Sequence, residues 1–332
     1  MSLERLQADG PATARFGLGL AAVARPGYIT LGRSEDLPEH RSVEALRERT
    51  RHLLDAAYAQ GVRYFDVARS YGRAEEFLGS WLDAHPEAGR AGTGDAVVGS
   101  KWGYTYTAGW HTDAEVHEVK DHGLATFERQ LAETRALLGT RLDLYQIHSL
   151  TPDSPALTDT ALHRRLAGLA NQGVTVGFSS SGPAQRDAIR AALAVTVDGT
   201  PLFRSVQATY NLLEPSAGPA LAEAHAAGCT VIVKEGMANG RLADRNATGP
   251  DTAALRVTAA ATGAGCDAVA LAAVAAQPWV DVVLSGAADV RQLDSNLSAA
   301  ELALAPEDLD RLSALAQPAR DYWAHRSGLP WN

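Results

Sequence analysis

Residues 62–85 read VRYFDVARSYGRAEEFLGSWLDAH and combine a short apolar run with a longer amphipathic segment. The run at 62–66 has the length of a buried strand, whereas the segment at 74–85 has apolar residues at helical spacing. Between them, Asp66 and Tyr71 place a carboxylate and a phenol five residues apart, just past the strand. A helix-capping Asp and a surface Tyr are the ordinary interpretation of such a stretch. The rest of the chain has to decide between capping and chemistry.

The same strand-and-helix unit recurs along the chain. Seven more apolar runs, each leading to a helical pattern, are FGLGLAAV (16–23), AVVGSKWG (96–103), LDLYQIH (142–148), VTVGFS (174–179), SVQATYN (205–211), TVIVKEG (230–236) and VDVVLSG (280–286). Such alternation builds βαβ units, and therefore a parallel sheet that is buried on both faces. Eight units within 332 residues predict an α/β protein with a (β/α)8 TIM barrel, formed as a single domain over residues 1–332.

An open, doubly wound sheet is the alternative arrangement of the same units. Its dinucleotide-binding form needs a G-x-G-x-x-G turn after the first strand, and FGLGL lacks the third glycine. The barrel therefore remains the better prediction. The polar stretch 104–122 and the tail 318–332 are predicted to be long functional loops at the carboxyl-terminal face of the barrel.

Composition limits the partners of the chain. The net charge of -9 argues against a nucleic-acid partner, and no apolar run is long enough to span a membrane or to act as a signal peptide. Cys229 and Cys266 share no spacing typical of a disulfide framework or a zinc site, and the histidines of the polar loop lack tight ligand spacing. We expect a cytoplasmic enzyme without a metal, and the sequence indicates no oligomeric state.

Polar side chains follow nearly every predicted strand, where barrel enzymes place their active sites. They are Asp66, Lys101, His148, Ser179, Ser180, Gln207, Lys234 and Glu235. The chain has only three lysines, and Lys101 and Lys234 both follow apolar runs, while Lys120 is expected to begin a helix on the outer face. Each of these residues also has a purely structural interpretation. Lys101 could be a side chain that snorkels at the barrel rim, and His148 could be a hydrogen-bonded histidine of the core.

Taken together, these groups predict a positioned proton donor. Tyr71 has an ordinary pKa of about 10, and a neighbouring lysine would lower that pKa by stabilising the phenolate. Asp66 can hold the lysine, and His148 can orient a carbonyl oxygen placed against Tyr71. Hydride reduction of an aldehyde or ketone needs such a donor, because the oxygen becomes an alkoxide.

The stretch FDVARSYGRAEEFLG resembles the Asp-x-Ala-x-x-Tyr-Gly-x-x-Glu-x-x-Leu-Gly signature of the aldo-keto reductase superfamily. VVGSKWG and LDLYQIH are similar to two further family motifs, and the resemblance covers essentially the whole chain. It implies an NAD(P)H-dependent oxidoreductase that reduces a small-molecule aldehyde or ketone, or oxidises the matching alcohol or sugar. It also implies a catalytic tetrad of Asp66, Tyr71, Lys101 and His148, with Tyr71 as the general acid.

The resemblance also implies the residues that hold the cofactor. They are Ser179, Ser180, Gln207, Lys234, Gly286, Arg291, Gln292 and Asn296. Ser180 stands where relatives have Asn, and Lys234 with Glu235 replaces an apolar segment that carries a stacking aromatic, so a salt bridge is expected there. Arg291 is expected to bind the 2′-phosphate, which predicts a modest preference for NADPH with NADH also used. Arg241 and Arg245 are the next candidates for that phosphate.

Aromatic residues are predicted to line the substrate pocket, since ligand sites are rich in them. Trp102, Tyr104 and Trp110 follow Lys101, and Trp323 would form the opposite wall together with Tyr322 and Trp331. A sugar, an aromatic aldehyde and a polyketide ketone would fit equally well.

Two other functions stay open. One is a barrel aldolase or lyase with a Schiff-base lysine. The other is a cofactor-binding regulatory protein with little turnover, as the resemblance to potassium-channel β subunits permits.

Overall fold

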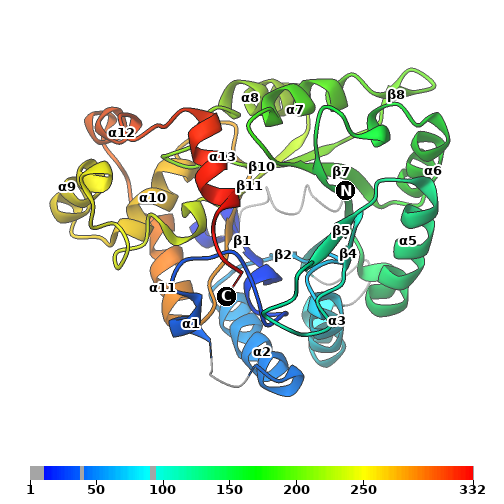
Figure 1. Cartoon of the computed structure of the whole chain (residues 1–332), viewed down its shortest axis with the longest axis horizontal. Helices are drawn as coiled ribbons and strands as arrows, with labels where there is room; N and C mark the ends of the chain where they lie inside the picture. The colour runs from blue at the N-terminus through cyan, green and yellow to red at the C-terminus, as the bar shows by residue number, and fades with distance from the viewer. Residues whose placement is uncertain (1–10, 38–40, 90–94, 332) are drawn as a thin grey trace.

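The computed structural model describes residues 11–37, 41–89 and 95–331. Within them, eight parallel strands close into a barrel in the order β1-β12-β11-β10-β7-β6-β3-β2 (Figure 1). The strands are β1 (Phe16–Gly19), β2 (Tyr64–Asp66), β3 (Val97–Trp102), β6 (Leu144–Leu150), β7 (Thr175–Ser180), β10 (Ser205–Thr209), β11 (Thr230–Lys234) and β12 (Val282–Ser285). Each one contains or overlaps a run predicted from the sequence, so the TIM-barrel prediction is confirmed.

Helices surround the barrel, and the amphipathic ones among them bury an apolar face against it. The longer ones are α2 (Val43–Ala59), α3 (Ala74–Ala84), α5 (Leu124–Leu138), α6 (Thr160–Ala170), α7 (Gln185–Leu193), α8 (Gly218–Ala226), α9 (Ala253–Thr262), α10 (Cys266–Ala275), α11 (Val290–Ser298), α12 (Pro306–Ser313) and α13 (Ala319–Ser327), and the short ones are α1 (Arg33–Asp36) and α4 (Pro86–Gly89). Over the described ranges, no single helix is long and apolar enough to cross a membrane. The pair 250–262 and 266–275 passes that test only when joined, and it is bent by 95°.

Tyr64 fills the barrel interior directly beneath the predicted site. A Cβ at Gly17 would lie 2.7 Å from the Tyr64 ring, and one at Gly99 would lie 2.2 Å from its hydroxyl, so glycine is needed at both places. Asp66 is two residues further along β2 and therefore points to the same face. The Tyr64 hydroxyl donates to Asp66 Oδ1 at 3.2 Å. The packed core thus supports the first residue of the predicted tetrad.

The polar stretch 104–122 is more regular than expected. It contains an antiparallel hairpin of β4 (Tyr104–Tyr106) and β5 (Glu118–Lys120). Lys120 ends β5, so the expectation that it begins a helix on the outer face is wrong. The smaller hairpin of β8 (Thr196–Val197) and β9 (Thr200–Pro201) was not predicted. In Figure 1, the tail after α13 runs back across the barrel toward β1 and the first hairpin.

Candidate active site

A cavity of about 520 Å³ opens where the barrel strands end. Asp66, Tyr71, His148 and Gln207 all line it, although they come from four different places in the sequence. Lys101 lies beneath them in β3 and is completely buried. The structure therefore brings the predicted tetrad together at one edge of one cavity.

Asp66 and Lys101 form a buried ion pair. The Lys101 ammonium also donates to the Val67 carbonyl at 3.1 Å, and Asp66 Oδ1 accepts from the Gln207 amide nitrogen at 2.8 Å. Burial lowers the pKa of Lys101, while the carboxylate of Asp66 opposes that shift. The pair is fixed in position because both charged groups have hydrogen-bond partners in addition to each other.

Tyr71 lies on the turn after β2, edge-on to the His148 ring with 5.5 Å between centroids. Gly72 makes this turn with φ of 59°, and a Cβ there would lie 2.5 Å from the Ala24 carbonyl oxygen, so only glycine fits. The Lys101 ammonium is 4.9 Å from the centre of the Tyr71 ring. The turn therefore holds the phenol between the imidazole and the buried lysine.

Burial raises the pKa of Tyr71 well above its usual value, and the carboxylate of Asp66 raises it further. Arg25, whose guanidinium carbon lies 5.2 Å from the ring centre, opposes the shift. The expected net lowering of the Tyr71 pKa by the lysine is thus wrong. Tyr71 consequently holds its proton.

His148 is the neutral partner at the same edge. Burial and then the positive charges of Lys101, Lys234 and Arg25 lower its pKa well below the usual value. Its Nδ1 lies 3.4 Å from the Ser70 hydroxyl. The imidazole is therefore uncharged at neutral pH, and one ring nitrogen carries a proton that it can donate in a hydrogen bond.

Ser179 and Ser180 do not line the cavity, contrary to what their predicted role requires. Both are completely buried. Ser179 Oγ accepts from the backbone amide of Ser149 at 2.8 Å, and Ser149 has a φ of 55°. Ser179 thereby supports the strained backbone beside His148. Ser181, which the sequence did not single out, lines the cavity instead.

Gln207 fits a bound carboxamide. Its amide nitrogen is committed to Asp66, and its amide oxygen is buried with no hydrogen-bond partner in the described part of the chain. An unsatisfied buried acceptor is costly, so a ligand that donates a hydrogen bond to it would be favoured. The placement of Gln207 at the carboxamide of a nicotinamide stays a prediction.

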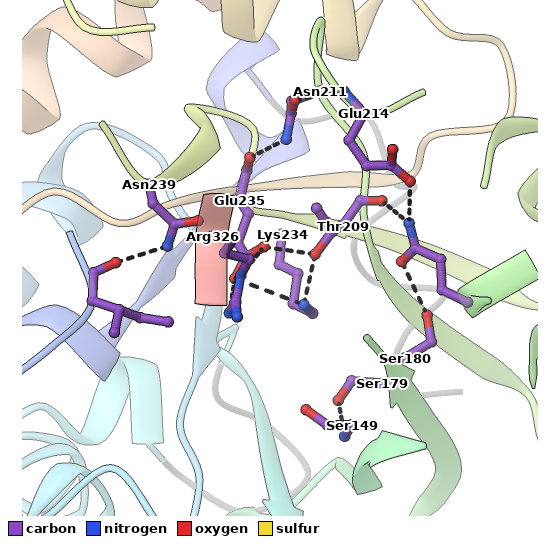
Figure 2. Close-up of polar contacts among 12 residues, drawn as sticks. Ser149, Ser179, Ser180, Thr209, Asn211, Glu214, Lys234, Glu235, Asn239 and Arg326 are labelled. Carbon is purple, nitrogen blue, oxygen red and sulfur yellow. Dashed lines mark hydrogen bonds and ion pairs between the residues drawn. The ribbon is translucent and has the colours of Figure 1, made fainter. Parts of the chain in front are cut away.

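Lys234, Thr209, Glu235 and Arg326 form a charged network on one wall (Figure 2). The Lys234 ammonium donates to Thr209 Oγ1 at 2.8 Å, and that hydroxyl donates to Glu235 Oε2 at 2.8 Å. Glu235 binds Arg326 of α13 with Nε 3.0 Å from Oε1, and Lys234 is 4.0 Å away from that oxygen. The expected salt bridge exists, but its main cation is Arg326. Arg326 was not predicted, because it lies 91 residues further along the chain than Glu235.

This network shifts two pKa values strongly. Burial lowers the pKa of Lys234 to about 8, although Glu235 opposes the shift. Burial alone would raise the pKa of Glu235, but Arg326 and Lys234 outweigh burial and hold it at about 2. Glu235 is thus an anion that Arg326 neutralises, and Lys234 is a lysine that loses its proton easily.

The aromatic wall agrees only in part with the predicted one. The predicted Tyr104 and Trp331 line the cavity, together with Tyr28, which was not predicted. Trp102 points to the opposite face of β3 from Lys101 and packs on Phe127, with 5.1 Å between ring centroids. Side chains alternate along a strand, which explains why adjacent residues have different surroundings.

Trp110 and Trp323 are also absent from the cavity lining. The Trp110 indole donates to the Arg41 carbonyl at 2.8 Å, which directs it away from the site. Trp323 is buried in α13 and lies against Arg326, with 5.2 Å from the guanidinium carbon to its ring centre. Its contact with the site is therefore indirect.

The other end of the cavity is lined by Gly286, Gln292 and Asn296, as the resemblance implies. Arg291 does not reach it, because the side chain is 93% exposed at the start of α11 and pairs with Asp289 at 3.3 Å. Arg245 does line the cavity. Its predicted counterpart Arg241 lies outside the lining, 3.8 Å from Asp251.

No metal site accompanies these groups. Within residues 11–37, 41–89 and 95–331, no cluster of His, Cys, Asp and Glu could hold a metal ion. Cys229 and Cys266 are both free and buried.

The barrel thus holds a buried Asp-Lys pair, a protonated Tyr and a neutral His at one edge of one cavity. A model of the Aldo/keto reductase family matches residues 33–317. The chain belongs to the aldo/keto reductase family, whose members are oxidoreductase enzymes.

Individual relatives are distant. The pyridoxal 4-dehydrogenase of Microbacterium luteolum is 30% identical over 112 residues, which are 30% of this chain and 33% of that protein. The match therefore spans about a third of that relative. The holo form of an aldo-keto reductase from Bacillus halodurans has a TM-score of 0.69 at 20% identity, covering 92% of this chain and 93% of that one. A structure from Pseudomonas aeruginosa, described as an aldo-keto reductase, has a TM-score of 0.60 at 23% identity, with coverages of 86% and 90%.

Proposed function

We propose that the protein is a nicotinamide-dinucleotide-dependent oxidoreductase that interconverts an aldehyde or ketone and the matching alcohol or sugar. The observation that carries this proposal is the convergence of Asp66, Lys101, Tyr71 and His148 on one cavity. Each of them has a chemical role that its surroundings support. Tyr71 is the general acid in the reducing direction and the general base in the oxidising direction.

The dinucleotide fits the residues present. Gln207 would accept a hydrogen bond from its carboxamide, while Gln292 and Asn296 line the far end of the cavity. Lys234 lies between these two regions, on β11. When bound, the cofactor supplies or accepts the hydride.

The side chains of the tetrad manage the proton and the developing charge. Tyr71 holds its proton because burial raises its pKa. His148, a neutral imidazole, would donate a hydrogen bond to the carbonyl oxygen and orient it. Lys101 is 4.9 Å from the Tyr71 ring centre and would stabilise the phenolate that remains after proton transfer. Asp66 keeps the lysine in place and so acts as a positioning residue.

The substrate pocket favours a flat, polar ring among the substrates that the sequence left open. Tyr28, Tyr104 and Trp331 supply aromatic surface, and the Arg25–Glu118 ion pair lies among them. The pyridoxal 4-dehydrogenase match names a heteroaromatic aldehyde of this kind. We therefore infer an aromatic or heteroaromatic aldehyde, or the cyclic hemiacetal that it forms, as the substrate class.

The test is turnover of dihydronicotinamide with a panel of pyridoxal, benzaldehydes, aldoses and polyketide-like ketones, followed by absorbance. We expect turnover with aromatic aldehydes and its near-complete loss in Tyr71→Phe. Failure of every carbonyl and every alcohol in both directions, with the cofactor bound, would favour the regulatory alternative.

One observation keeps a Schiff-base mechanism as the second candidate. The pKa of Lys234 is about 8, so part of its amine is unprotonated near neutral pH and able to attack a carbonyl. Lys101 is less suitable, since Asp66 holds its ammonium. Borohydride treatment with substrate followed by mass spectrometry would trap an adduct on Lys234 in a lyase and leave a reductase unmodified.

A further inference from the structure

The far end of the cavity is electronegative. Its lining includes the carboxylates of Asp36, Asp244 and Asp267, and Arg245 is the one cation among the described lining residues at this end. Asp244 Oδ1 accepts from the amide of Cys266 at 2.7 Å. Asp267 accepts from the Ser295 hydroxyl at 2.5 Å, so it lies beside α11, the helix that carries Gln292 and Asn296. Three carboxylates and one guanidinium leave a net negative charge.

The guanidinium of Arg245 is already bound by a carboxylate of this chain. Arg245 Nη1 and Nη2 donate to the two oxygens of Asp36, both at 2.6 Å, and Nη2 also donates to the Leu31 carbonyl at 3.2 Å. This is the bidentate arrangement by which arginine binds a carboxylate or a phosphate. Because Asp36 uses it, a phosphate would have to displace that carboxylate. Glu35, 3.8 Å from Arg245, adds a second negative charge at the same guanidinium.

The buried polar atom that lacks a hydrogen-bond partner at this end is an acceptor. Asn239 lines the cavity and is 7% exposed. Its amide nitrogen donates to the Ile29 carbonyl at 2.9 Å, and its buried amide oxygen has no partner in the described residues. Figure 2 shows this nitrogen in its hydrogen bond and the oxygen turned to the other side. A ligand hydroxyl can donate to such an acceptor, whereas a fully ionised phosphate cannot.

A separate property of Cys266 agrees with the negative potential. Burial and then Asp244, by a hydrogen bond and by its charge, raise the pKa of the Cys266 thiol to about 12, and Asp267 adds to the shift while Arg256 opposes it. The same carboxylates would oppose the two negative charges of a ribose 2′-phosphate. They would accept hydrogen bonds from a ribose 2′-hydroxyl.

We propose that this chain selects NAD(H) over NADP(H), and that Asp36 determines the selection by occupying Arg245. This inference rests on the proposed function, because it assigns the ribose of the proposed cofactor to the Asp36–Arg245 end. It replaces the NADPH preference expected from Arg291, which the structure places outside the cavity.

Isothermal titration calorimetry with NAD+ and NADP+ tests the proposal without any turnover. The full chain should bind NAD+ at least about tenfold more tightly than NADP+, the value of one charge-assisted hydrogen bond. Asp36→Asn should release Arg245 and lower the ratio of the NADP+ Kd to the NAD+ Kd about tenfold. Asp251→Asn is the matched control, since Asp251 is exposed and outside the cavity lining, and it should change neither Kd.

Asp267→Asn is the second variant, because Asn still accepts from Ser295 while it removes one negative charge. It should also lower the ratio of the NADP+ Kd to the NAD+ Kd. Tighter binding of NADP+ by the wild-type chain overturns the proposal and leaves the proposed oxidoreductase intact. If the ratio of the two Kd values stays unchanged in folded Asp36→Asn and Asp267→Asn, these carboxylates do not determine the selection. Binding of neither dinucleotide overturns the proposed function itself.

Discussion

Gln207 of β10 donates a 2.8 Å hydrogen bond to Asp66 of β2 across the interior of the barrel. The same carboxylate binds Lys101, which lies beneath Tyr71. One amide thus joins the proposed carboxamide site to the proposed proton donor. A ligand that fixes the Gln207 amide oxygen would therefore also fix the position of Asp66.

Gln207→Leu is expected to weaken dinucleotide binding. It removes the unsatisfied acceptor and one of the donors to Asp66, so the Kd measured by calorimetry or fluorescence should rise about tenfold. Gln146→Leu is the matched control, because Gln146 is equally buried in β6 but does not line the cavity. Equal losses in both variants would contradict the assignment of Gln207.

Tyr71→Phe should reduce kcat by about 10²–10⁴-fold or more, because it removes the proton donor alone. The Kd for the dinucleotide should stay nearly unchanged, since the ring and its contact with His148 remain. Tyr210→Phe serves as the control, because Tyr210 packs on Trp279 outside the cavity lining. Near-wild-type kcat in Tyr71→Phe would mean that another group is the acid.

Lys101→Met should damage both activity and stability. The phenolate that remains after proton transfer loses the ammonium 4.9 Å from the ring centre, so kcat should fall. Breaking the buried pair with Asp66 should also cost about 3–5 kcal/mol of unfolding free energy, seen in urea denaturation. Lys120→Met should have little effect, because Lys120 is exposed on the hairpin and outside the cavity lining. Similar losses from both lysines would refute the site.

Acid should destabilise the protein through Glu235. Its pKa is lowered from 4.5 to about 2 in the folded chain, so its stabilising contribution is complete above pH 4.5 and disappears as the pH falls through 2. The shift corresponds to about 3 kcal/mol. Glu235→Gln should flatten the fall in unfolding free energy between these pH values, whereas Glu307→Gln, at an exposed position in α12, should not. If the unfolding free energy of Glu235→Gln falls with pH as in the wild type, the Glu235–Arg326 pair is not the cause of the acid destabilisation.

The parts of the site that follow strand ends could be predicted from the sequence. Asp66, Lys101 and His148 are fixed by β2, β3 and β6, and a closed parallel barrel brings the ends of its strands to one face. Arg326 could not be predicted, because the path of the tail across the barrel depends on tertiary packing. Trp102 was placed wrongly for a simpler reason, since the alternation of side chains along β3 turns it away from the face that holds Lys101.

The assignment of Ser179 and Arg291 to the cofactor site shows a further limit of prediction from motifs. Ser179 and Arg291 occupy the sequence positions that the resemblance implies, yet one supports the backbone of Ser149 and the other is exposed. Motif spacing specifies where a residue lies along the chain. It does not specify whether the side chain reaches the cavity, which here depends on neighbouring hydrogen bonds.

The tail residue Trp331 should control substrate binding. Its ring stacks on His117 of the hairpin segment, with 4.3 Å between centroids, and lies 5.0 Å from the Arg25 guanidinium carbon. Trp331→Ala removes this aromatic wall and a cation–π contact, so the KM for an aromatic aldehyde should rise about tenfold. The kcat and the Kd for the dinucleotide should stay the same, because Trp331 contacts neither Lys101 nor Gln207. Trp279→Ala, a buried tryptophan outside the cavity lining, should lower the Tm without raising KM. An unchanged KM in Trp331→Ala would place the substrate ring away from the tail.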